Sequence, residues 1–303
     1  MNRPGQTSAS EAGHVTAAIQ RALGLGRPPR AAGRVGGGSI NRCLRYETER
    51  GPVFVKLAGA PAMSMFEAEA AGLAALSQAR AVRVPQVLAC VADGDLALLI
   101  LEWLELGPPT RAGDVLFGEQ LARQHGHTER HFGWHRDNTL GTTPQHNAWC
   151  EDWIGFLRTR RFGPQLDLAE RNGADGRVLD RGRRLCERLS AFFEGYRPQP
   201  SLLHGDLWAG NRAQARNGDP VVFDPAVYFG DREADIAMTR LFGGFGPDFY
   251  AAYHATWPLD AGAPARSTLY NLYHVLNHFN LFGGGYLRQA RSMIDELLAQ
   301  AGA

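Results

Sequence analysis

Hydrophobic and polar residues alternate with two different periods along this chain, and the change of period divides it into two parts. In the first part, short apolar stretches separated by turn residues are typical of strands. They predict an antiparallel sheet built from the segments 34–46, 53–57, the extended stretch that starts at Pro85, and 96–101. Two amphipathic or helix-favouring segments in the same part predict helices over 9–23 and 63–79.

The second part follows the period of amphipathic helices. It predicts helices over 115–127, 148–161, 178–196, 233–241, 249–256 and 267–299, with a loop-rich stretch from 202 to 230. Because the pattern changes near Leu104 to Pro109, we expect an N-terminal lobe over 1–104, flexible over 1–12, and a C-terminal lobe over 105–303. The predicted fold class is α+β, with an antiparallel sheet and an inserted helix in the first lobe and mainly helices in the second.

Composition narrows the choice of partners. The 303 residues include 32 Lys plus Arg and 31 Asp plus Glu, a net charge of +1, so we expect no nucleic acid and no acidic membrane as partner. The longest apolar stretch, 96–101, is far shorter than the roughly 20 residues that a membrane span needs. Four scattered cysteines form no CxxC pair, so we predict reduced thiols in a cytoplasmic protein.

The segment around Asp206 carries the most specific chemical pattern. Its HxD triplet is followed by Asn211, and Asp224 ends the apolar stretch 221–223. Transfer of a phosphoryl group to a hydroxyl needs a carboxylate that accepts the proton, an amide oxygen for Mg²⁺ and a second carboxylate for the metal. We interpret Asp206 as the catalytic base, and Asn211 and Asp224 as the metal ligands. The alternative is a loop in which His204 and Asp206 cap turns.

Lysine occurs once in the chain, at Lys56, among arginines at every other basic position. Lys56 ends the apolar strand, where kinases hold the lysine that binds the α and β phosphates of ATP. The planar guanidinium of arginine cannot replace a compact ammonium between two phosphates and a carboxylate. This explains why a lysine is present at this position although all other Lys or Arg positions hold arginine. Glu69 is its predicted partner, because it lies beside the apolar face of helix 63–79, whereas Glu67 is rotated about 200° away. An exposed edge lysine is the alternative.

Two weaker features concern the nucleotide. The cluster Gly36, Gly37, Gly38 and Ser39 precedes Lys56 and could cover phosphates with backbone amides, although it is neither GxGxxG nor a Walker loop. Glu102, Trp103 and Leu104 follow a strand, where backbone groups could bind adenine; an ordinary linker would have the same pattern.

Histidines gather between residues 125 and 146 without the spacing of a metal site. We therefore predict no zinc and interpret them as surface residues or substrate contacts: His125, His127, His131, His135 and His146.

Long segments of the chain resemble the fructosamine kinase (ketosamine-3-kinase) family, a branch of the aminoglycoside-phosphotransferase-like kinases. The resemblance runs from about residue 15 to 298. It rests on GGGSIN, FVK, FEAEAAGL, FGWHRDNTLGTTPQHN, EDWIGFLRTRRFGPQL, LLHGDLWAGN, FDPAVYFGDREADIAM and FNLFGGGY.

This resemblance implies a two-lobed protein-kinase-like fold and ATP-dependent phosphorylation of the C3 hydroxyl of a ketosamine on a small amine or a protein lysine. The 3-phosphate is unstable and releases the amine, so the activity would be deglycation. The resemblance supports the roles argued above, with ATP and Mg²⁺ as cofactors, and adds candidates on the substrate side: Asp137, Asn138, His204 and Trp208.

Two departures from the family concern specificity and control. Ser39 stands where many members have Cys, so we expect no redox control at that position, and residues 134–136 differ from the commoner ones, which could alter the sugar preference. An aminoglycoside- or choline-type phosphotransferase would share every nucleotide-side residue, and a catalytically silent nucleotide-binding protein is the alternative from another class. The sequence leaves open the sugar, the carrier amine and the oligomeric state.

Overall fold

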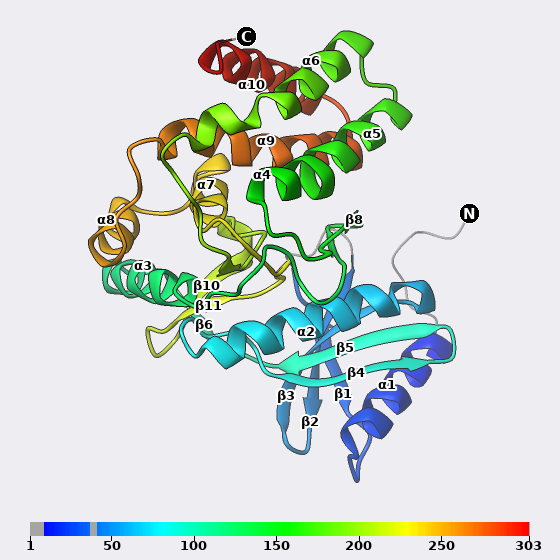
Figure 1. The fold of residues 1–303 in the computed structure, drawn as a ribbon. Helices are drawn as coiled ribbons and strands as arrows, with labels where there is room; N and C mark the ends of the chain where they lie inside the picture. The colour runs from blue at the N-terminus through cyan, green and yellow to red at the C-terminus, as the bar shows by residue number, and fades with distance from the viewer. Residues whose placement is uncertain (1–8, 37–40, 303) are drawn as a thin grey trace. The chain divides into compact units, whose positions relative to one another are not determined.

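The computed structural model describes residues 9–36 and 41–302 (Figure 1). The contacts divide the chain into two compact units: unit 1 comprises 1–74 and 85–105, and unit 2 comprises 75–84 and 106–303. The predicted lobe boundary lies one residue before the division at Glu105, and the prediction placed 75–84 in the first lobe. Most of the segment predicted to be flexible, residues 1–8, lies outside the described residues.

Unit 1 is built on a five-stranded antiparallel sheet in the order β1-β2-β3-β5-β4, which confirms that the sheet is antiparallel. The segment predicted over 34–46 overlaps two of its strands, β1 and β2, and most of β1 was not predicted. Its strands are β1 (Arg30–Arg34), β2 (Arg42–Thr48), β3 (Gly51–Gly59), β4 (Val87–Asp93) and β5 (Leu96–Glu102). The helices are α1 (Ala9–Leu23) and α2 (Met63–Ala79), with the bounds that the sequence predicted, and a 3₁₀ turn, Ala60–Ala62, precedes α2. The last part of α2, from residue 75 on, is counted with unit 2.

Strand β3 shows how the sheet presents the single lysine. Side chains alternate between the two faces of a strand. Val55 and Leu57 join Val15 and Ile19 of α1 in an apolar core, so one face of the sheet packs on α1. Lys56 lies between these two strand residues and therefore points to the opposite face, where α2 lies (Figure 1).

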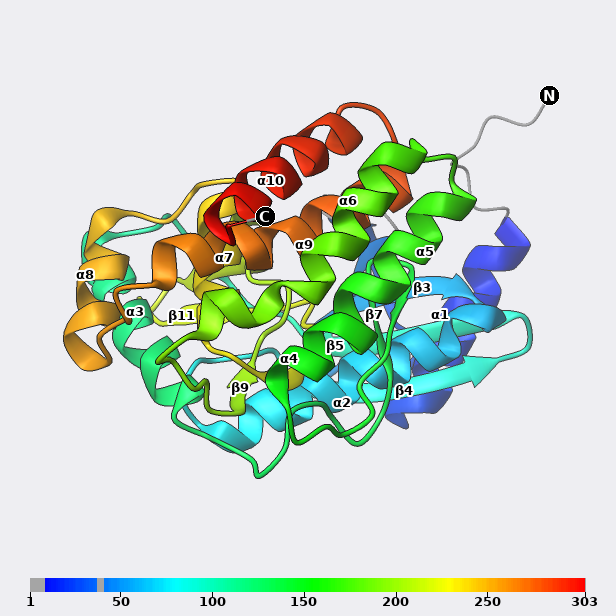
Figure 2. The same ribbon diagram turned by 45° about the horizontal axis from the view of Figure 1, so that its top comes forward.

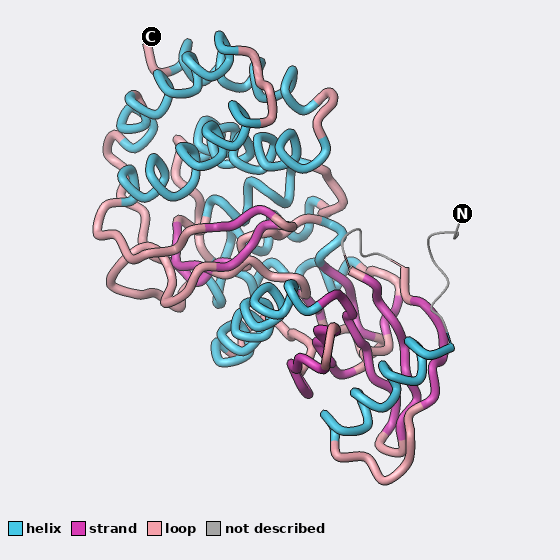
Figure 3. Tube along the Cα trace, turned by 90° about the vertical axis from the view of Figure 1, so that its right-hand side faces the viewer, coloured by secondary structure: helices cyan, strands magenta, loops and turns pink. Residues whose placement is uncertain are grey.

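Unit 2 is mainly helical, with short pairs of strands, as Figure 3 shows by colour. The helices are α3 (Arg111–His125), α4 (Trp153–Phe156), α5 (Gly163–Arg171), α6 (Gly176–Glu187), α7 (Glu233–Leu241), α8 (Pro247–Thr256), α9 (Ala263–Phe282) and α10 (Tyr286–Gln300). Helix α9 packs against α5, α7 and α10, while α3 packs against α8 (Figure 2). No helix in the described ranges is both long and apolar enough to cross a membrane.

The strands of unit 2 are short and antiparallel. They are β6 (Leu106–Gly107), β7 (Asn138–Leu140), β8 (Thr143–Gln145), β9 (Ser201–Leu203), β10 (Arg212–Ala215), β11 (Pro220–Val222) and β12 (Tyr228–Gly230). They pair as β7–β8, β9–β12 and β6–β10–β11. The predicted loop-rich stretch 202–230 thus contains three of these strands and most of β9, and the strands position the residues between them.

Several element boundaries differ from the prediction. The helix predicted over 267–299 is two helices, because Gly283 and Gly284 adopt φ values of 66° and 63°, a left-handed conformation that ends α9. The helix predicted over 148–161 begins only at Trp153, where the Asp152 carboxylate accepts the N–H groups of Ile154 and Gly155.

Three further differences follow along the chain. The helix that begins at Trp153 continues as a π-helical turn over Leu157–Phe162. Helix α5 was not predicted, since its Gly-Pro start resembles a break although proline fits the first helical turn. The helix predicted over 178–196 ends at Glu187 and gives way to a 3₁₀ turn over Leu189–Phe193.

Candidate active site

Unit 1 holds a buried ion pair at its single lysine. Lys56 Nζ donates to Glu69 Oε1 at 2.7 Å, and the lysine is 4% exposed. The register places Lys56 opposite Cys43 of β2 and Leu99 of β5. Glu67, the carboxylate that helical rotation disfavoured as a partner, is exposed. The structure thus contains the predicted pair, in which a carboxylate fixes the position of a compact cation suited to phosphate.

The structure says less about the predicted glycine cluster on the nucleotide side. Gly36 lies in an exposed bend, whereas Gly37, Gly38 and Ser39 lie outside the described residues.

At the end of β5, Glu102 exchanges two hydrogen bonds with Gln86: its N–H donates to the Gln86 carbonyl, and its carboxylate accepts the Gln86 N–H. The Trp103 indole donates to Glu105 at 2.9 Å and lies 4.5 Å from the Arg45 guanidinium. These contacts engage the Glu102 N–H and the Glu102 and Trp103 side chains. Binding of adenine by backbone groups of residues 102–104 stays a prediction.

In unit 2, β9 leads into the loop that carries Asp206. Gly205 has φ of 82°, and a Cβ there would lie 2.1 Å from the Ala226 carbonyl oxygen, so only glycine fits without displacing the chain. The Asp206 N–H donates to Nδ1 of His204, whose Nε2 bonds to the carbonyl of Phe223. His204 is fully buried and uses both ring nitrogens within the protein, so it links this loop to the strand end before Asp224.

The three residues predicted to carry the chemistry lie together. Asn211 Nδ2 donates to the Asp206 carbonyl at 2.9 Å, to Asp206 Oδ2 at 3.2 Å and to the Asp224 carbonyl at 3.4 Å. Asp224 has φ of 56°, a conformation uncommon outside glycine and typical of functional sites. Burial, and then the nearby Asp224 carboxylate, raises the pKa of Asp206 to about 7. A carboxylate with that pKa is well matched to accepting a proton near neutral pH.

The donor set fits a magnesium ion. The nitrogen of the Asn211 amide makes the three contacts above, so the amide oxygen lies on the opposite branch of the group. That oxygen and the Asp224 carboxylate are hard oxygen donors of the kind that Mg²⁺ prefers.

A residue that no sequence motif assigned holds the loop in place. Asp235, on α7, is 1% exposed. Its Oδ2 accepts the His204 N–H at 2.7 Å, and its Oδ1 accepts the Gly205 N–H at 2.9 Å. The sequence offered one signal, the family-like segment FDPAVYFGDREADIAM, but no spacing rule connects residue 235 to residue 204.

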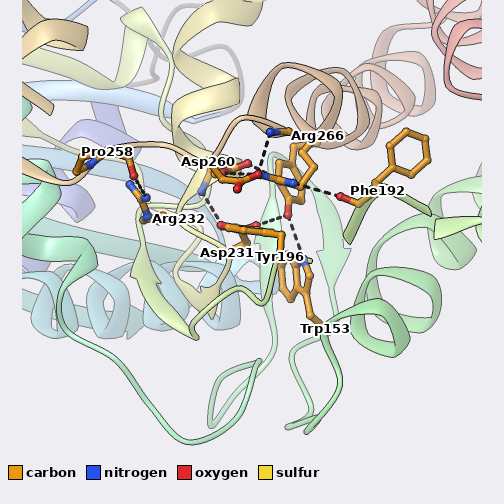
Figure 4. A network of polar contacts seen from close by, with 11 residues as sticks. Trp153, Phe192, Tyr196, Asp231, Arg232, Pro258, Asp260 and Arg266 are labelled. Carbon is orange, nitrogen blue, oxygen red and sulfur yellow. Dashed lines mark hydrogen bonds and ion pairs between the residues drawn. The ribbon is translucent and has the colours of Figure 1, made fainter. Parts of the chain in front are cut away.

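The helix that carries Asp235 is anchored at its first turn by a polar network (Figure 4). Asp231 accepts the hydroxyls of Tyr196 at 2.9 Å and Tyr270 at 2.6 Å, and it also accepts the Glu233 N–H. Arg266 of α9 donates twice to the Glu233 carboxylate, at 2.8 and 3.0 Å. These bonds fix the first turn of α7 and thereby the position of Asp235, its third residue, which bonds to the loop.

The predicted substrate-side residues differ in accessibility. Trp208 is 37% exposed, and its ring meets that of Phe242 edge to face. Asp137 is exposed; it bonds to His146 and to the Asn147 N–H. Asn138 is buried and bonds to the Val227 carbonyl, so it supports the β7–β8 hairpin.

The prediction that treated the five histidines alike is wrong for His125. That residue ends α3 and is 0% exposed, with both ring nitrogens hydrogen-bonded inside unit 2, whereas the other four are exposed or partly exposed. Among the described residues, no group of three or more His, Cys, Asp or Glu side chains is placed to hold a metal ion.

Known proteins similar to this chain agree on one family. A probable ketoamine kinase of Synechocystis sp. is 42% identical over 289 residues, which cover 93% of this chain and 96% of the relative. The chloroplastic protein-ribulosamine 3-kinase of Arabidopsis thaliana is 43% identical over 272 residues, 88% of this chain and 82% of its own.

Solved structures agree in fold. A Thermobifida fusca protein described as a fructosamine-3-kinase superposes with a TM-score of 0.83 at 31% identity, covering 94% of this chain and 98% of that one. An aminoglycoside phosphotransferase in complex with ADP and hygromycin B superposes with a TM-score of 0.66 over 95% of this chain and 99% of its own; at 13% identity this likeness concerns the kinase-like fold. The family model named fructosamine kinase matches residues 12–300, so the chain belongs to the fructosamine kinase family.

Proposed function

We propose that this chain is a ketosamine 3-kinase, which transfers the γ-phosphoryl group of ATP to the C3 hydroxyl of a ketosamine on a small amine or a protein lysine. Family membership supports the reaction class, and relatives named ketoamine kinase and protein-ribulosamine 3-kinase support the acceptor. The observation that carries the assignment of the site is the cluster of Asp206, Asn211 and Asp224.

In the proposed reaction the C3 oxygen attacks the γ phosphorus, the bond from that phosphorus to ADP breaks, and the hydroxyl proton passes to Asp206. The raised pKa of Asp206, about 7, suits this transfer, and the Asn211 amide keeps the carboxylate oriented. Asn211 and Asp224 would hold magnesium, which when bound neutralises phosphate charge.

The remaining roles follow the chemistry of each residue. Lys56 would bind the α and β phosphates of ATP, with Glu69 holding its ammonium in position. Trp208 would offer an exposed aromatic face to the sugar, and Asp137 is the second accessible candidate. His204 and Asn138 are buried and bonded within the protein, so we assign them to supporting the loops rather than to contacting substrate.

A panel of acceptors tests the proposal. The chain is incubated with ATP, Mg²⁺ and, separately, fructose-lysine, ribulose-lysine or an aminoglycoside, and NMR assigns the position of the new phosphate. We expect phosphate on C3 of at least one ketosamine, and loss of transfer when EDTA removes the metal. Transfer to the aminoglycoside alone would favour the alternative acceptor class. A cytoplasmic location stays a prediction.

Asp206→Asn tests the base. The amide keeps the shape of the carboxylate but cannot accept the proton, so turnover should fall below detection while ATP binding by calorimetry stays near that of the parent. Asp167→Asn, on an exposed face of α5, is the control and should leave both unchanged. Retained turnover in Asp206→Asn would exclude Asp206 as the base.

A further inference from the structure

A chain of buried hydrogen bonds reaches the Asp206 loop from the far side of α7. Arg232, just before α7, donates to the hydroxyl of Tyr253 on α8 at 3.1 Å, and that hydroxyl lies 2.8 Å from Nδ1 of His125. Nε2 of His125 lies 3.2 Å from Oδ2 of Asp235. All four side chains are at most 6% exposed.

The direction of every bond follows from chemistry. Arg232 can only donate, and it is held by the carbonyls of Trp257 and Pro258, the latter contact drawn in Figure 4. The Tyr253 oxygen therefore accepts from Arg232. Burial lowers the pKa of His125, so the ring is neutral and carries one proton. Because the Asp235 carboxylate can only accept, that proton is on Nε2, and Nδ1 accepts the Tyr253 hydroxyl.

Asp235 connects this relay, the hydrogen-bonded series from Arg232 through Tyr253 and His125, to the loop that carries Asp206. Its two oxygens accept the N–H groups of His204 and Gly205, the residues immediately before Asp206. Burial by itself would raise the pKa of Asp235, but the hydrogen bond from His125, together with the other polar contacts, outweighs it and keeps the pKa below its usual value. The two backbone N–H groups are held most strongly when the Asp235 carboxylate is ionised and its orientation is fixed.

We propose that His125 is a positioning residue for phosphoryl transfer: with Nδ1 held by the Tyr253 hydroxyl and Nε2 donating to Asp235, it orients Asp235 and so holds the backbone that carries Asp206. The effect on turnover rests on the proposed role of Asp206; the effect on the loop does not. Without the Tyr253 hydroxyl, the His125 proton can move to Nδ1. Nε2 and Oδ2 would then face each other as two acceptors, and Asp235 would turn away from the loop.

Tyr253→Phe is the decisive variant, because it deletes one oxygen and leaves the His125 and Asp235 side chains themselves unchanged. Tyr250→Phe is its matched control: Tyr250 lies on the same helix, and its hydroxyl bonds to Thr239 of α7 at 3.1 Å, so this variant also removes a hydroxyl through which α8 contacts another part of unit 2. Two readouts are compared, steady-state kinetics and the amide hydrogen exchange of His204 and Gly205 followed by NMR.

In Tyr253→Phe we expect kcat to fall about tenfold with KM for ATP unchanged, and exchange at both amides to accelerate about tenfold, the loss expected for one buried hydrogen bond. The control should change neither, although both variants should unfold at similar urea concentrations. His125→Gln keeps a donor near the Nε2 position and should retain more activity than His125→Leu, which keeps none.

Unchanged exchange at His204 and Gly205 in Tyr253→Phe would overturn the proposal, as would equal effects in Tyr253→Phe and Tyr250→Phe. If exchange accelerates as expected but Asp206→Asn still turns over substrate, the relay stands and the assignment of the base fails. The role of His125 is therefore tested by amide exchange in Tyr253→Phe, and the role of Asp206 as the base by the turnover of Asp206→Asn.

Discussion

Position 205 shows how strictly a single residue can be determined by its surroundings. Gly205→Ala would combine a left-handed backbone with a Cβ 2.1 Å from the Ala226 carbonyl oxygen, so the loop must shift. Because displacement of about 1 Å can cost about a hundredfold in rate, we expect kcat to fall by about that factor. Steady-state kinetics and urea unfolding check this.

Gly173→Ala separates strain from displacement. Gly173 has nearly the same φ, 80°, but a Cβ at this position would have no neighbouring atom within 4 Å and would meet open space. The variant should lose about 1 to 2 kcal/mol of unfolding free energy through backbone strain and keep full activity. Equal kinetics in the two glycine variants would contradict the role given to the loop.

Lys56→Arg is the second prediction at this scale. The guanidinium is larger and planar, and it would replace a buried ammonium that is 4% exposed and bonded to Glu69 at 2.7 Å. We expect kcat/KM to fall about a hundredfold or more, since the charge is kept but its position between phosphates and carboxylate is not. Arg30→Lys, on the exposed strand β1, should leave kinetics unchanged. Near-normal activity of Lys56→Arg would refute the inference drawn from the single lysine.

The residues that sequence analysis found and missed differ in one respect. Glu69 and Glu67 could be separated because helical rotation is a local property of consecutive residues. His125 and Asp235 could not be connected, because their bond joins positions 110 residues apart through the packing of different helices. The composition of the 125–146 segment even favoured a surface role for His125, which its burial contradicts.

At the scale of elements, periodicity predicted α1, α2 and α7 with the bounds that the structure has. It failed where a helix ends without losing its apolar pattern, as between α9 and α10, because glycine dihedrals rather than hydrophobicity stop the helix there.

Arg266→Leu tests the anchor at the start of α7. Arg266 and Glu233 form a two-fold hydrogen-bonded pair, and both are at most 3% exposed. Removing the cation leaves the Glu233 charge buried without its main partner, which should cost about 3 kcal/mol or more of unfolding free energy in a urea titration. Arg183→Leu breaks an exposed pair with Glu170 and should change the midpoint little. Similar losses in both variants would show that burial is not what gives the anchor its strength.

For the whole molecule, buried histidines should make stability depend on pH. Burial, and then the neighbouring His278, lowers the pKa of His274 to about 3, below the value of 6.5 for an unperturbed histidine. The unfolded chain therefore binds a proton below pH 6.5 that the folded chain does not, and stability falls as pH falls from 6.5 towards 3.

The expected size of this effect is about 2 kcal/mol between pH 7 and pH 5. Asp206 and Asp231 have raised pKa values and therefore make stability rise as pH falls, opposite to His274. The contribution of His274 is therefore measured as the difference between the parent chain and a His274 variant. Compared with His274→Gln, the parent chain should lose about 2 kcal/mol more in urea unfolding over this range. Parallel pH profiles of the two proteins would argue against a neutral buried His274.

The sequence by itself determined the fold class and the family, because strand and helix periods and the segments shared with the family are written along the chain. The single lysine and the spacing of Asp206, Asn211 and Asp224 made these residues the candidates for phosphoryl transfer, and that role stays a prediction. Tertiary structure alone decided how those residues are held. The bond from Asp235 to the Asp206 loop, the tautomer of His125 and the burial of His204 depend on groups that are distant in sequence. Burial is also what raises the pKa of the Asp206 carboxyl group to about 7.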